Sequence, residues 1–94
     1  MTQSELIVAV YQRLNLSKSV VDEVIDAYFR EIEGHLLKGN KVMLTGFGRF
    51  DTRVRKARRF YSPLTRRRFE LPSLVIPTFR FSPVLTNKVK RHFN

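Results

Sequence analysis

The 94-residue sequence contains no cysteine. This absence excludes a disulfide framework and a thiolate metal site. The sequence also lacks an apolar run of the ~18 residues that a membrane-spanning helix requires. Its first residues show neither the basic segment nor the apolar segment of a signal peptide, which favours a cytoplasmic protein.

The sequence has only eight Asp and Glu residues and eighteen Lys and Arg residues, which gives a net charge of +10. An excess of this size predicts a polyanionic partner, nucleic acid first and an acidic membrane second. The excess is confined to one half of the chain, since residues 1–45 carry a net charge of −1 and residues 46–94 one of +11. We therefore expect the second half to bind the partner.

Two amphipathic helices are predicted for the first forty residues. Thr2 and Glu5 match a capping box, and apolar residues then recur at helical spacing up to Leu14. A second helix is expected to begin after Ser17, a favoured N-cap residue, and to end near Gly39, which can take the left-handed conformation that closes a helix. The two helices would form a helical hairpin.

The sequence then changes to the two-residue period of strands. Residues 42–45 predict a short strand, and Gly46-Phe47-Gly48 predicts a turn. Along residues 49–55 the two faces of a strand differ, one being apolar and one charged. The apolar face carries Phe50, Thr52 and Val54, and the charged face carries Arg49, Asp51, Arg53 and Arg55.

Residues 56–72 are basic and contain too few apolar residues to form a core. Ser62-Pro63 is a turn signal, because proline fixes φ at a value suited to β-turns. We interpret residues of about 53–74 as an arm of two basic strands with Pro63 at its tip, mobile without a partner. A strand at 74–79 returns to the body, and Ser82-Pro83 begins a short basic helix.

The predicted architecture is α+β. It consists of the helical hairpin, a three-stranded antiparallel sheet extended into a β-ribbon arm, and the short C-terminal helix. We expect one domain over residues 1–94, because a chain of this length buries only about 60–65% of its unfolded surface and has no room for two cores. Residues 1–45 hold the helices and the first strand, 46–81 the sheet with the arm, and 82–94 the last helix.

This order of elements resembles the bacterial histone-like HU/IHF family over the whole chain. The residues that carry the resemblance are Ser4-Glu5-Leu6-Ile7, Gly46-Phe47-Gly48 with Phe50, Arg53, Arg55 and Arg58, Pro63 with Thr65, and Ile76-Pro77-Thr78-Phe79-Arg80. The resemblance implies an intertwined dimer, with residues 1–45 in the dimerisation body. Two arms would bind duplex DNA in the minor groove and bend it largely without sequence specificity. It also implies a nucleoid-associated protein that compacts and organises DNA.

The resemblance further assigns roles to residues. Pro63 would be the wedge that enters between base pairs and kinks the duplex. Phe47, Phe50 and Phe79 would lie in the core, whereas we expect Phe60 and Tyr61 to contact DNA rather than pack across the arm. The candidate DNA-binding residues are Arg53, Arg55, Lys56, Arg58, Arg59, Tyr61, Ser62, Pro63, Leu64, Thr65, Arg66, Arg67, Arg68 and Arg80.

The arm tip departs from the family's usual Gly-Arg-Asn-Pro-x-Thr-Gly. It reads Phe60-Tyr61-Ser62-Pro63-Leu64-Thr65-Arg66, so that both glycines are replaced and Tyr61 stands where the family has arginine. We expect a stiffer, more aromatic tip, in which Tyr61 and Leu64 either add wedging surface or obstruct insertion. Gln3 and Pro83 replace two lysines common in the family, which predicts a shorter DNA footprint or weaker wrapping.

Two alternatives remain open, an RNA-binding or ribosome-associated basic protein and an HU-like protein that bends DNA little. An enzyme is not expected, because the sequence lacks a base–nucleophile pair, a metal set and a phosphate-binding glycine loop. His35 and His92 lack further ligands at suitable spacing, so neither a metal nor a cofactor is expected. The predicted partners are duplex DNA and a second copy of the chain, with no membrane and no small-molecule substrate.

Overall fold

Helix α1 (Gln3–Leu14) begins and ends where the sequence predicts. The Glu5 amide donates a hydrogen bond of 3.2 Å to the Thr2 hydroxyl, which confirms Thr2 as the N-cap. The helix ends at Asn15, whose φ of 55° is the left-handed conformation that asparagine tolerates better than most residues. The computed structural model describes all residues, 1–94. The chain forms two compact units, Met1–Gly34 and His35–Asn94.

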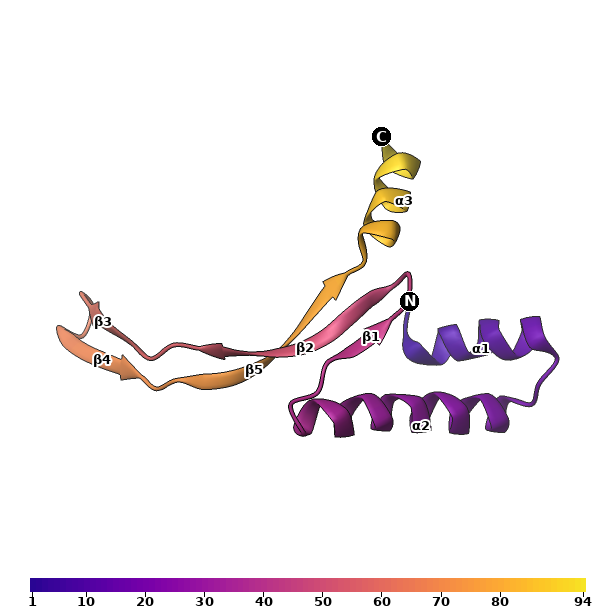
Figure 1. Ribbon diagram of the computed structural model, residues 1–94, viewed down its shortest axis with the longest axis horizontal. Helices are drawn as coiled ribbons and strands as arrows, with labels where there is room; N and C mark the ends of the chain where they lie inside the picture. Colours follow the sequence, from indigo (N-terminus) through magenta and orange to yellow (C-terminus); the bar gives the residue numbers. More distant parts are fainter. The chain divides into compact units, whose positions relative to one another are not determined.

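Helix α2 (Lys18–Leu37) runs back along α1 to complete the predicted helical hairpin (Figure 1). The Val20 amide donates to the Ser17 hydroxyl at 3.3 Å, so Ser17 caps this helix as expected. After the helix, Gly39 takes a φ of 79°, the left-handed value predicted for it. No helix is long and apolar enough to cross a membrane.

The second unit contains a three-stranded antiparallel sheet. Its strands are β1 (Val42–Leu44), β2 (Gly48–Arg55) and β5 (Leu74–Phe81), in the order β1-β2-β5. The predicted Gly46-Phe47-Gly48 turn joins the first two strands, with Gly46 at a φ of 76°. Helix α3 (Pro83–Phe93) follows β5, and the Val84 amide donates to its N-cap, Ser82, at 3.2 Å.

The predicted arm is present as a two-stranded ribbon that continues from β2 and β5 (Figure 1). Its outer part is a separate sheet of β3 (Arg58–Ser62) and β4 (Arg67–Leu71). Residues 56–57 and 72–73 belong to neither ladder, so the arm is interrupted between its base and its outer part. The sequence did not predict this interruption.

Aromatic rings pack together on the apolar face of the sheet. Phe50 lies opposite Phe79 with ring centroids 4.7 Å apart, and Phe81 lies 5.1 Å from Phe79. This agrees with the predicted core role of Phe50 and Phe79, which are half-buried. Phe47 lies 6.4 Å from Phe79 but is 52% exposed, so a single chain covers it only in part.

Few side chains are buried within the single chain. The buried hydrophobic residues are Ile7, Val21 and Ile32, all in the helical hairpin. Large apolar side chains such as Val24, Phe29 and Val89 remain about half exposed or more. A chain of this length normally requires a larger interior than this to be stable by itself.

Replacing Gly48 with alanine should destabilise the sheet by about 1–3 kcal/mol, as overpacking commonly does. Gly48 is buried, and a Cβ at this position would lie 2.5 Å from the Arg80 carbonyl oxygen and 2.5 Å from the Phe79 ring. Denaturant unfolding at fixed protein concentration measures the change. The matched control is Gly34→Ala in α2, where no atom lies within 4 Å of the new Cβ; it should stabilise by about 0.5–1 kcal/mol. Equal stability of the Gly48 variant and the parent would contradict this packing.

Candidate nucleic-acid interface

The charged face of the sheet gathers arginines from both strands that form the base of the arm. Strand pairing places Arg49 opposite Arg80, and Arg53 opposite Ile76. Arg55, opposite Leu74, extends this face toward the arm. A shallow recess on the face is lined by Arg49, Asp51, Thr52, Arg53, Thr78 and Arg80. We call the four arginines at positions 49, 53, 55 and 80 the basic face.

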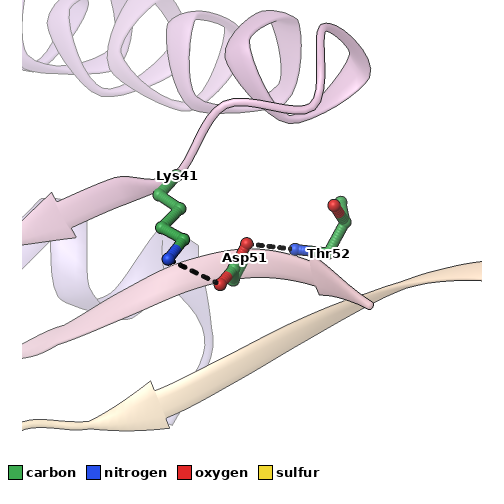
Figure 2. A network of polar contacts seen from close by, with 3 residues as sticks. All are labelled: Lys41, Asp51 and Thr52. Atoms are coloured by element: carbon green, nitrogen blue, oxygen red, sulfur yellow. Dashed lines mark hydrogen bonds and ion pairs between the residues drawn. The ribbon is translucent and has the colours of Figure 1, made fainter. Parts of the chain in front are cut away.

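Asp51 is the acidic residue of this face, and its carboxylate is held by nearby groups (Figure 2). Its Oδ1 accepts a 2.8 Å hydrogen bond from the Thr52 amide. Its Oδ2 lies 3.9 Å from the Nζ of Lys41, the residue that directly precedes β1. Lys41 thus offsets the negative charge of Asp51, and no arginine of the basic face forms an ion pair. Their guanidinium groups remain available to an anionic ligand.

The outer arm has two different faces. The register pairs Arg59 with Glu70 and Tyr61 with Arg68 on one face, and the Arg59 Nε lies 3.1 Å from the Glu70 Oε1. Both side chains of this ion pair are largely exposed, so it contributes little to stability. The other face carries Arg58, Phe60, Ser62, Arg67, Phe69 and Leu71.

Phe60 packs across the arm, against our expectation that it would contact DNA instead. It lies opposite Phe69, with ring centroids 5.3 Å apart and ring planes at 21°. The arm therefore has an apolar pair of its own, although both rings stay partly exposed and form no buried core. The pair forms because four turn residues bring positions 60 and 69 into register, which composition does not reveal. Tyr61 lies on the opposite face and is 57% exposed.

The arm tip is a four-residue turn, residues 63–66, with Pro63 first as predicted. The Arg66 amide donates a 2.8 Å hydrogen bond to the Ser62 carbonyl, which closes the turn. Arg66 has a φ of 56°, the left-handed conformation that favours glycine, and the family motif has glycine at this position. Arg66 is therefore strained by about 1 kcal/mol.

Replacing Arg66 with glycine should relieve this strain and order the tip. We expect the protection of the residue-66 amide against hydrogen exchange to rise about fivefold, which corresponds to ~1 kcal/mol. Exchange measured by NMR on the DNA-free protein reports it. Arg67→Gly is the matched control, because glycine within β4 weakens the strand and should lower protection. Lower protection in both variants would contradict a left-handed Arg66.

The structure brings most of the predicted site residues onto one arm, whose base and outer part are separate ladders. Arg53 and Arg55 lie at its base, and Lys56 lies in the unpaired segment that follows. The rest of the predicted arm set lies on β3, the tip turn and β4: Arg58, Arg59, Tyr61, Ser62, Pro63, Leu64, Thr65, Arg66, Arg67 and Arg68.

Two groups of basic residues were missed as candidates. Arg49 joins the basic face because it pairs with Arg80, and the alternation along residues 49–55 already placed it on the charged side. Helix α3 carries Lys88, Lys90 and Arg91, a basic run that composition shows but that no motif marked. The structure holds no group of three or more His, Cys, Asp or Glu residues that could bind a metal ion.

Comparisons with known proteins agree with this geometry. The profile of a family described as "Bacterial DNA-binding protein" matches residues 1–90. The DNA-binding protein HU of Staphylococcus aureus (strain COL) is 37% identical over 90 residues, which are 96% of this chain and 100% of that protein. HU of Geobacillus stearothermophilus is 40% identical over the same shares of the two chains.

Solved structures show the same fold. One chain of an Anabaena HU–DNA cocrystal structure superposes with a TM-score of 0.84 at 35% identity, covering 95% of this chain and 97% of that one. HU from Thermotoga maritima superposes with a TM-score of 0.66 at 26% identity, covering 95% and 98% of the two chains.

Proposed function

This chain belongs to the family of bacterial DNA-binding proteins that includes HU, and we propose that it is an architectural protein that binds and bends duplex DNA. The observation that carries the proposal is the basic face, which continues along β2 and β5 into a basic arm. Such a surface matches the phosphate backbone, a sequence-independent target. Binding is therefore expected to have little sequence preference.

The arm residues are proposed to act along the minor groove. Arg53, Arg55 and Arg58 suit phosphates and a narrow groove, because arginine carries a planar cation at any pH. The remaining contacts are assigned to the basic residues and the tip: Lys56, Arg59, Tyr61, Ser62, Leu64, Thr65, Arg66, Arg67, Arg68 and Arg80. Pro63 is assigned the wedge, since it presents a rigid apolar edge without an N–H that needs a partner.

The proposed assembly is a homodimer. Its support is the exposure of apolar side chains in the single chain, where Leu37 is 82% and Phe47 52% exposed while only three hydrophobic residues are buried. A second copy would cover this surface and would set two arms on one duplex. Residues 1–45 are proposed as the dimerisation body, 46–81 as the sheet with the arm at about 53–74, and 82–94 as the terminal helix.

The cellular role that follows is DNA organisation rather than catalysis. Neutralising phosphates and bending DNA would help to compact the chromosome, and this supports a cytoplasmic, nucleoid-associated protein. Its partners are then duplex DNA and its own second copy. The chain requires no cofactor for this role, because bending derives from contacts and charge.

Gel-shift titration of duplex DNA, nicked duplex DNA and duplex RNA of one sequence tests the proposal. We expect nicked DNA to bind most tightly, intact DNA next and RNA least. An A-form RNA duplex has a wide, shallow minor groove that does not fit an arm shaped for B-form DNA. RNA binding as tight as DNA binding would instead support an RNA-binding or ribosome-associated protein.

A further inference from the structure

Leu64 is unusual for its exposure. At 96% exposed it is the most exposed of the large hydrophobic side chains, although turns normally consist of polar residues. It follows Pro63 directly, so two apolar residues stand side by side at the tip of the arm. A single exposed leucine is ordinary on a protein surface, and the following observations distinguish this one.

The turn that holds Leu64 has a fixed shape. It is closed by the hydrogen bond from the Arg66 amide to the Ser62 carbonyl, and Ser62 pairs with Arg67 as the last step of the ladder. Two residues below, the Phe60 and Phe69 rings are stacked across the strands. These contacts support the turn that carries the apolar tip, although the strained Arg66 weakens it.

Three cations follow the apolar pair after a single intervening residue. Arg66, Arg67 and Arg68 are all exposed and come immediately after Thr65. An apolar point beside three cations is complementary to a ligand with an apolar interior and an anionic rim. A base-pair stack between two phosphate backbones has this pattern. An anionic lipid surface shares the charge pattern, but two apolar residues are too few to anchor a protein there.

We propose that Leu64 enters the same base step as Pro63, so that each arm carries a two-residue wedge. The inference rests on the proposed function, in which the arms lie in the minor groove. A wider wedge covers more of the base surface that unstacking exposes, which favours the kinked duplex. Leu64 then biases the step at which the tip enters, because pyrimidine–purine steps such as TA unstack most readily, while the phosphate contacts stay independent of sequence. We expect the arm tips to settle at such steps.

The test compares Leu64→Gln with the parent on duplexes that carry 2-aminopurine beside a single TA step. Unstacking by the parent raises the fluorescence of the probe, and the Gln variant should keep only part of this rise, because Pro63 still enters the step. We expect its affinity for the TA duplex to fall about fivefold, because glutamine loses the favourable free energy of partly burying the leucine side chain between the bases. Because Leu64 is almost fully exposed, the substitution should leave the fold intact.

Val54→Thr is the matched control, since Val54 is 65% exposed on β2, away from the tip, and the change also replaces an apolar side chain by a polar one. This control should keep the parent's fluorescence and affinity. Unaltered fluorescence in Leu64→Gln on a duplex that the protein still binds and bends would overturn the inference. The inference would also be overturned if Leu64→Gln lost the parent's binding to anionic lipid vesicles but bound and unstacked DNA as the parent does. Failure of the parent itself to bind or bend DNA would instead overturn the proposed function.

Discussion

Alanine at both Arg53 and Arg55 should weaken binding to every DNA sequence by about three to four orders of magnitude near 0.1 M salt. A homodimer loses four guanidinium groups from the basic face, and removing each phosphate-binding cation should flatten the plot of log affinity against log salt by ~1. The expected change in slope is therefore about four. Titration of one duplex at several salt concentrations measures both quantities.

The control for this pair is the double replacement of Arg13 and Arg30 by alanine. It removes the same charge from the helical hairpin, where Arg30 pairs with Asp26 at 3.1 Å on an exposed surface. Its salt slope should stay close to that of the parent. If the Arg53 and Arg55 variant also kept the parent slope, these residues would not contact phosphates.

Alanine at Pro63 should reduce DNA bending far more than it reduces affinity. The wedge drives unstacking, which costs a few kcal/mol that other contacts of the bent complex offset. Without Pro63 the duplex stays straighter, while the arginines of the arm still bind phosphates. Energy transfer between dyes on the two DNA ends should report a longer end-to-end distance in the variant complex, with affinity within about tenfold of the parent.

Pro72→Ala provides the comparison for this prediction. Pro72 lies in the interruption between β4 and β5, away from the tip, and the change removes a proline from the same arm. Its complex should bend DNA as the parent complex does. An end-to-end distance in the Pro63 variant equal to that of the parent would show that Pro63 does not act as a wedge.

The helices, the sheet and the tip proline were predictable because their signals are local. Thr2 and Ser17 mark helix starts through side chains that bond to nearby amides, and both caps are present. Gly39 and Gly46 have positive φ values, as the chain's turning points require. The alternation along residues 49–55 placed Arg49, Arg53 and Arg55 on one charged face, to which strand pairing adds Arg80.

Features that depend on register between distant strands were not predictable. Phe60 meets Phe69 and Arg49 meets Arg80 only once the length of the tip turn and the pairing of β2 with β5 are fixed. The interruption at residues 56–57 and 72–73 likewise depends on both strands together. The left-handed Arg66 could be suspected only from the glycine that the family has at this position.

The sequence of one chain also does not show which apolar residues stay exposed until a second molecule covers them. Val24 and Phe47 follow patterns typical of core residues, yet they are 61% and 52% exposed in the single chain. Periodicity identifies which face is apolar but not which molecule covers it. The family resemblance predicts the homodimer, and the exposed apolar side chains of the single chain support it.

Basic arms that bind a duplex and bend it should have a higher affinity for DNA that is already bent than for straight DNA. The most direct test measures affinity and end-to-end distance together, on straight and pre-bent duplexes, across a salt series. We expect the pre-bent duplex to bind about tenfold more tightly or better, because its bending cost is already met. The ends of the straight duplex should approach on binding, and both effects should fade as salt rises. Equal affinity for the two duplexes, with no change in end-to-end distance, would contradict DNA bending by the arms.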